Sequence, residues 1–117
     1  LEEAQNIANS YNATLCIIHS AKSDSDADMQ AGKEILDNAR TSVDALEIET
    51  RLVYADIIYG LNGISEAIAA AVNEWGADLL VVGTANRRGL ERFVIGSVAE
   101  QLVSKVESSI LLVRPNA

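Results

Sequence analysis

The residues best suited to chemistry lie in a glycine-containing segment in the last third of the chain. The segment reads Gly83-Thr84-Ala85-Asn86, then nine residues, then Gly96-Ser97. Backbone N–H groups at the start of a helix are unpaired and carry about half a positive charge, so they attract anions. The spacing therefore predicts a phosphate-binding loop over residues 83–97. The same pattern also fits an ordinary capped turn between a strand and a helix.

The residues on either side of this loop predict a strand before it and a helix after it. Residues 79–82 are apolar without alternation, which is typical of a strand buried on both faces of a parallel sheet. Gly83 predicts a sharp turn at the carboxyl end of that strand. Ser97, with Glu100 three residues later, forms a capping box that predicts a helix starting at Val98. The helix start should therefore face the loop.

These motifs resemble those of the universal stress protein family. The resemblance rests on the glycine loop, the Gly-Ser pair followed by Val98-Ala99-Glu100, and a closing apolar strand over residues 109–114. In nucleotide-binding members the loop wraps the phosphates of ATP, and the serine after the last glycine contacts them. Carried over by position, the resemblance implies the nucleotide-binding residues Val82, Gly83, Ala85, Asn86, Arg87, Gly96, Ser97, Val98 and Ala99, with Ser20 from an earlier strand end. The implied ligand is ATP, with Mg²⁺ as its accompanying ion.

Asn86 stands where the family has its second glycine. A non-glycine residue in the left-handed conformation costs about 1–2 kcal/mol, and asparagine is among the cheapest substitutes. Charge-assisted hydrogen bonds from Arg87 or Arg88, at about 1.5–3 kcal/mol each, would compensate. If the Asn86 side chain instead fills the phosphate space, ATP binding fails. The loop thus leaves both a binding and a non-binding member of the family open.

Composition limits the classes of partner. The chain has 117 residues, 49% of them apolar, which suits a single domain over residues 1–117. A net charge of −8 repels nucleic acid and anionic lipid, and no apolar run approaches the roughly 20 residues that span a bilayer. Cys16 is the single cysteine and lies in an apolar run, so it predicts a small buried residue and a cytoplasmic location.

Hydrophobic periodicity predicts an alternation of helices and strands. The predicted elements are a helix over 1–11, a strand over 14–19, a loop over 20–28, a helix over 29–46, a strand near a sheet edge over 47–54, a turn over 59–63, a helix over 64–75 closed by Gly76, and then the strand, loop, helix and strand described above. This order predicts a three-layer α/β/α fold with a parallel sheet.

The resemblance implies five strands in the order 3-2-1-4-5, with a central first strand that precedes the first helix. No such strand is visible, so we expect further residues before Leu1. In the family the end of that strand supplies an aspartate that holds the nucleoside, and no residue of this chain can be given that role. The resemblance also implies a homodimer formed through the last strand, with Ile110, Leu111, Leu112 and Val113 at the interface.

The sequence contains no pattern that identifies a catalytic or metal-binding residue. It has no Ser-His-Asp order, no Cys/His spacing for zinc and no lysine after the glycines that would hold a phosphate. Asp24, Asp26 and Asp28 imitate the start of a calcium loop, but Met29 stands where that loop needs glycine. Our leading hypothesis is a homodimeric stress-response module that binds ATP or another adenine nucleotide. The alternatives are an interaction dimer without nucleotide and, ranked last, a slow ATP hydrolase.

Overall fold

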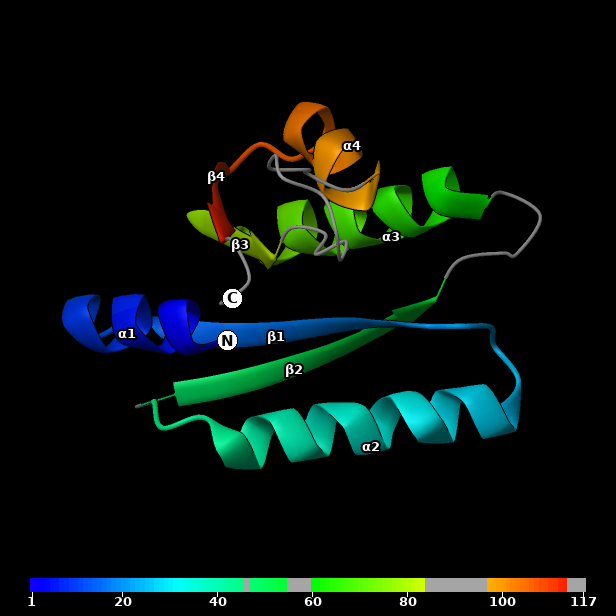
Figure 1. Ribbon diagram of the computed structural model, residues 1–117, viewed down its shortest axis with the longest axis horizontal. Helices are drawn as coiled ribbons and strands as arrows, with labels where there is room; N and C mark the ends of the chain where they lie inside the picture. Colours follow the sequence, from blue (N-terminus) through cyan, green and yellow to red (C-terminus); the bar gives the residue numbers. More distant parts are fainter. Residues whose placement is uncertain (46, 55–59, 84–96, 114–117) are drawn as a thin grey trace, which may run out of the picture.

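A computed structural model describes residues 1–45, 47–54, 60–83 and 97–113 (Figure 1). Helices and strands alternate along the chain in the predicted order. The elements are α1 (Glu2–Tyr11), β1 (Thr14–Ala21), α2 (Asp26–Ser42), β2 (Glu47–Tyr54), α3 (Gly60–Trp75), β3 (Leu79–Gly83), α4 (Ser97–Lys105) and β4 (Ser109–Val113). The α/β class predicted from the sequence is therefore confirmed.

The four strands form two parallel pairs. β1 pairs with β2 along eight residues, and β3 pairs with β4 along five. Within the described residues the pairs are separate two-stranded sheets. β2 is an edge strand, as predicted for residues 47–54. The five-stranded order 3-2-1-4-5 stays a prediction, because a strand that joins the two pairs does not occur among the described residues.

The helices lie on both sides of the first strand pair. Figure 1 shows α2 on one side of β1 and β2, with α3 and α4 on the other. The chain leaves β2, runs back through α3 against the direction of β1 and β2, and reverses again after Trp75 to enter β3 (Figure 1). Two reversals bring β3 back to the general direction of the first pair.

The main apolar core joins α2 to the first strand pair. Ile17 of β1, Leu36 of α2 and Val43 after α2 are buried together. Four partly buried side chains pack against them, namely Leu15, Ala39, Ile48 and Leu52. A methyl group at Gly32 would lie 2.6 Å from Leu52 Cδ1, so glycine allows α2 to approach β2 closely.

The loop predicted over residues 20–28 is shorter than expected. β1 continues through Ser20 and Ala21, and α2 begins at Asp26 rather than at Met29. The hydroxyl of Ser25 accepts a hydrogen bond from the Asp28 N–H at 3.2 Å and caps the helix. Acidic residues stabilise the positive end of a helix, so the polar run that suggested a loop is the first turn of α2.

Two further predictions of local structure differ from the structure. The turn predicted over residues 59–63 is wrong from Gly60 on, because Gly60 to Gly63 are the first turn of α3. Leu1, Tyr11 and Ile35 were expected on packed helix faces but are 58%, 79% and 49% exposed. α1 instead buries its small residues, Ala4 and Ala8.

The predicted end of α3 is confirmed. Gly76 adopts the left-handed conformation at φ 75°. Its N–H donates to the carbonyl oxygen of Val72 at 3.2 Å, and the Ala77 N–H reaches the same oxygen at 3.3 Å. This is the usual arrangement of a glycine that ends a helix.

α3 and α4 pack on one another and so position the start of α4. Val72 of α3 and Leu102 of α4 are each 2% exposed. The Asn73 side chain donates to the Lys105 carbonyl oxygen at 3.3 Å and accepts from the Glu107 N–H at 2.9 Å. The amide thus pairs the Lys105 carbonyl, which the end of α4 leaves free, and an N–H group of the turn that follows the helix.

Candidate functional site

Three of the predicted ligand-binding residues, at the end of β3 and the start of α4, line the same cavity. Val82 and Gly83 are the last two residues of β3, and α4 begins at Ser97, one residue before the predicted start. Val82, Gly83 and Val98 line one cavity. Ala99, by contrast, is buried at 5% exposure and is not part of that lining.

Four predicted contacts cannot be placed. Ala85, Asn86, Arg87 and Gly96 lie outside the described residues, as do Arg88 and Arg92. The loop hypothesis therefore rests on the two ends of the loop.

The described neighbours of Gly83 leave space for a side chain at this position. A methyl group placed there would meet no atom of the described residues within 4 Å. Among the described glycines only Gly76 has a positive φ, so Gly83 is not in the left-handed conformation. The sharp turn predicted after β3 lies outside the described residues. Gly83 is instead a paired strand residue opposite Val113. At the carboxyl end of β3, the described residues leave room beside Gly83 for a further group.

Ser20 contributes an unusual polar group at the corresponding end of β1. Its Oγ is buried and forms no hydrogen bond with the described part of the chain. A buried hydroxyl without a partner is costly, so such a group often faces a ligand, an ordered water or a missing segment. Ser20 does not line the cavity that contains Gly83.

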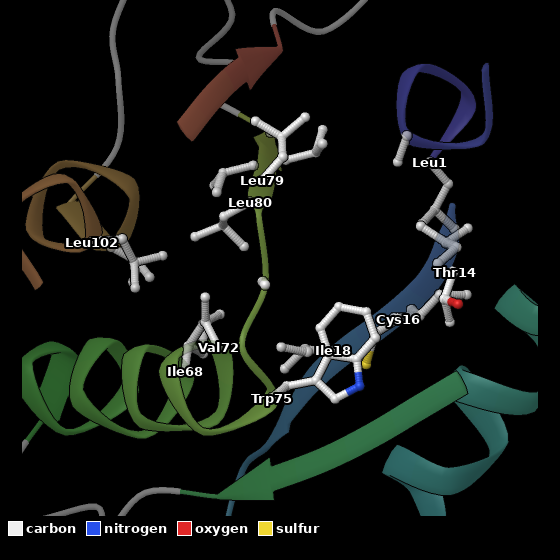
Figure 2. A pocket seen from close by; sticks show the side chains of 18 residues that line it. Leu1, Thr14, Cys16, Ile18, Ile68, Val72, Trp75, Leu79, Leu80 and Leu102 are labelled. Carbon is white, nitrogen blue, oxygen red and sulfur yellow. The ribbon is translucent and has the colours of Figure 1, made fainter. Parts of the chain in front are cut away.

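The cavity itself lies between the two strand pairs and was not found by reasoning about motifs. We call it the inter-strand cavity, and its volume is about 310 Å³. Its walls come from β1, β3 and three helices: Thr14 to Ile18, Leu79 to Gly83, Leu1 and Ala4 of α1, Ile68, Val72 and Trp75 of α3, Ala77, and Val98 and Leu102 of α4 (Figure 2).

The two strands were expected to be buried on both faces, and this expectation fails beside the cavity. Leu79 is 37% exposed, Gly83 is also exposed, and the three residues between them are partly buried. The unalternating apolar runs at 15–18 and 79–82 were the signal in the sequence, because such runs belong in the middle of a covered sheet.

The thiol of Cys16 is the titratable group of this cavity. Burial raises its pKa, the Arg51 guanidinium opposes the increase, and Glu49 adds to it. A raised pKa keeps the thiol protonated at neutral pH, so it is a weak nucleophile. Cys16 was predicted to be a small buried residue, and in the structure it is only partly buried.

The described residues contain no group of three or more His, Cys, Asp or Glu side chains that could hold a metal ion. Over the same ranges no helix has both the length and the apolar character needed to cross a membrane.

Comparison with known proteins decides the family. The sequence model of the Universal stress protein family matches residues 1–114. This chain belongs to the universal stress protein family. A putative universal stress protein of Staphylococcus aureus is 33% identical over 82 residues, which are 70% of this chain and 43% of that protein. The chain therefore spans less than half the length of the curated relatives it matches.

Solved structures of the family share the fold of this universal stress protein. The UspA protein of Lactobacillus plantarum superposes with a TM-score of 0.74, at 18% identity, over 97% of this chain and 86% of that one. A universal stress protein in complex with cAMP superposes with a TM-score of 0.63, at 28% identity, over 97% of this chain and 82% of that one. The α/β architecture with parallel strands is thus that of the family.

Proposed function

We propose that this universal stress protein binds an adenine nucleotide at the carboxyl end of β3, with its phosphates at the first turn of α4. The main support is the relative that is 28% identical, matches nearly the whole chain and was solved with cAMP. The room that the described residues leave beside Gly83 agrees with this position, because a ligand that approaches the backbone closely explains a glycine that these residues do not require. The unpaired amides at the start of α4 supply donors for phosphate.

ATP is the specific ligand that we propose, with the loop over residues 83–97 around its phosphates. In this proposal Val82, Gly83, Ala85 and Val98 contact the nucleotide, and Ser97 donates to a phosphate. Arg87 supplies positive charge that compensates for asparagine at position 86. Ser20 offers its unpaired hydroxyl from the end of β1.

We extend the proposal to the complete fold and its assembly. The two parallel pairs would become one sheet of order 3-2-1-4-5 when a central strand from outside the printed residues lies between β1 and β3. The last strand, β4, with Ile110, Leu111, Leu112 and Val113, would form the interface of a homodimer in the cytoplasm, because an apolar strand at the edge of a sheet favours aggregation unless it is covered.

One observation favours a second function, which is a stress-response dimer that holds no nucleotide. Asn86 replaces a glycine of the family motif, and its side chain would then fill the phosphate space. Hydrolysis of ATP ranks below both functions, since the sequence identifies no base, phosphate-binding lysine or carboxylate pair for magnesium that would stabilise the transition state.

The direct test is mass spectrometry of the purified protein after denaturation, followed by thermal melting with ATP, cAMP and GTP. Binding predicts co-purified adenine nucleotide and a higher melting temperature with ATP, because ligand at 100 times its dissociation constant stabilises by about 2.7 kcal/mol. Asn86→Gly should tighten binding and Ser97→Ala should weaken it. Unchanged melting at millimolar ATP in both the native protein and the Asn86→Gly variant would leave the nucleotide-free dimer as the function.

A further inference from the structure

A fully buried serine joins α3 to α4. Ser65 lies in the first half of α3 and is 0% exposed. Its hydroxyl donates to the side-chain oxygen of Gln101 on α4, Oε1, at 2.5 Å. Burial of a hydroxyl costs free energy unless the group is hydrogen-bonded, and alanine would fill a buried helix position without that cost. Apolar packing therefore does not explain a serine at this position.

The hydrogen bond from Ser65 reaches α4 close to the start of the helix. Gln101 lies four residues after Ser97, which corresponds to about 6 Å along a helix. The N–H groups of the turn before Gln101 have no partner within the helix. In the proposed function these groups are the donors to phosphate, so Gln101 lies one turn away from them.

Apolar contacts fix the position of α4 less tightly than this hydrogen bond does. Ala99 and Leu102 bury the inner side of the helix. Burial of apolar surface has no preferred direction, whereas a hydrogen bond weakens within a few tenths of an ångström and at a poor angle. A phosphate held by several N–H groups makes the same demand on each donor. The bond from Ser65 is therefore suited to hold these donors in place.

A second polar link between the two helices lies at the other end of α4, which rests against α3 (Figure 1). The Asn73 side chain contacts the carbonyl of Lys105, the last residue of α4, and the N–H of Glu107. Lys105 lies eight residues after Ser97, or about 12 Å along the helix. The Asn73 link thus holds the end of α4, and the Ser65 link holds the part nearer its start.

We propose that Ser65 is a positioning residue for the phosphates of the bound nucleotide. Through Gln101 it holds the first turn of α4 where the N–H groups of that turn meet the phosphates, and it touches no ligand itself. This inference rests on the proposed function and adds to it a residue of α3 that lies outside the glycine motif. It predicts that Ser65 affects the affinity for phosphate groups and not that for the nucleoside.

The test compares Ser65→Ala with Asn73→Ala, which removes the polar link at the other end of α4. Isothermal titration calorimetry measures the affinity for ATP, and competition with ATP measures that for adenosine, which has no phosphate. In Ser65→Ala we expect the affinity for ATP to fall about tenfold, as for the loss of one charge-assisted hydrogen bond, and that for adenosine to stay within about twofold. In Asn73→Ala both affinities should stay within about twofold of the native values.

A variant on the other helix tests whether Ser65 acts through Gln101. Gln101→Leu removes the acceptor and should weaken ATP binding as much as Ser65→Ala does. Because both changes break the same bond, the double variant Ser65→Ala/Gln101→Leu should bind ATP no more weakly than either single variant. Losses that add up in the double variant would contradict action through this bond.

The native protein distinguishes failure of this inference from failure of the proposed function. If the native protein binds ATP and Ser65→Ala binds it equally well, Ser65 does not position phosphate. The same conclusion follows if Ser65→Ala loses affinity for ATP and adenosine equally, or if Asn73→Ala loses as much ATP affinity, because a general loosening of α4 then explains the loss. If the native protein binds no ATP, the proposed function fails and this inference fails with it.

Discussion

Replacing Gly83 by alanine separates a glycine kept for a ligand from one kept for the fold. The added methyl group meets no atom of the described residues within 4 Å, and the backbone at Gly83 has no positive φ. The folded chain therefore accepts the methyl group without strain, while the unfolded chain loses conformational freedom. Such a substitution raises the free energy of unfolding by about 0.4–1 kcal/mol.

Gly76→Ala is the matched control. It also meets no atom within 4 Å, but its φ is 75°. A residue with a side chain pays about 1–2 kcal/mol for the left-handed conformation. Since 1 kcal/mol corresponds to roughly 4 °C in a domain of this size, Gly83→Ala should melt a few degrees above the native protein and Gly76→Ala about 4–8 °C below it.

Gly83→Ala should lower the affinity for ligand although it raises the stability of the fold. If a nucleotide approaches the Gly83 backbone, the methyl group occupies its space, and affinity for ATP or cAMP should fall at least tenfold, or about 1.4 kcal/mol, in isothermal titration calorimetry. Gly76→Ala, measured below its melting temperature, should bind like the native protein. A Gly83→Ala variant that melts as low as Gly76→Ala would refute the conformational argument. Unchanged affinity in a stable Gly83→Ala variant would refute the position of the site.

Three further outcomes are expected. Leu102→Ala should lower the free energy of unfolding by about 2–5 kcal/mol in urea denaturation, because Leu102 is 2% exposed. The control is Val103→Ala, a change at an exposed neighbour that should lower this free energy by less than about 0.5 kcal/mol. Equal losses in the two variants would contradict the packing of α4. Burial raises the pKa of Cys16 in the folded chain, so the thiol of the unfolded chain, with a pKa of about 8.5, loses its proton first as pH rises. The free energy of unfolding should therefore be constant below about pH 8 and fall as pH rises toward the pKa of the folded chain. Cys16→Ala should remove this pH dependence. Gly32→Ala should destabilise by about 1–3 kcal/mol, because its methyl group would lie 2.6 Å from Leu52 Cδ1, and a melting temperature at or above the native value would show that Leu52 moves aside freely.

The elements were predictable because their signals are local. Residues 47–54 form β2 with the predicted bounds, and Gly76 ends α3 in the left-handed conformation that few other residues adopt. The errors lie where one local signal competes with another. The acidic run before Met29 suggested a loop, but acidic residues also favour a helix start, and the Ser25 cap decides for the helix.

The candidate site was predicted in part. The motif located the end of β3 and the start of α4, and the structure brings Val82, Gly83 and Val98 to one cavity. The spacing of the motif could not show whether the neighbours of position 83 require glycine there. This requirement depends on which atoms surround position 83 in the folded chain.

By itself the sequence determined the order of helices and strands, the caps that bound them and the family motif, since each of these depends on residues a few positions apart. Only the tertiary structure decided that, within the residues it describes, β1 and β3 each have one edge that no other strand covers, beside a shared apolar cavity. Strand pairing joins residues that lie tens of positions apart, and whether such an edge is covered depends on the whole arrangement of the elements.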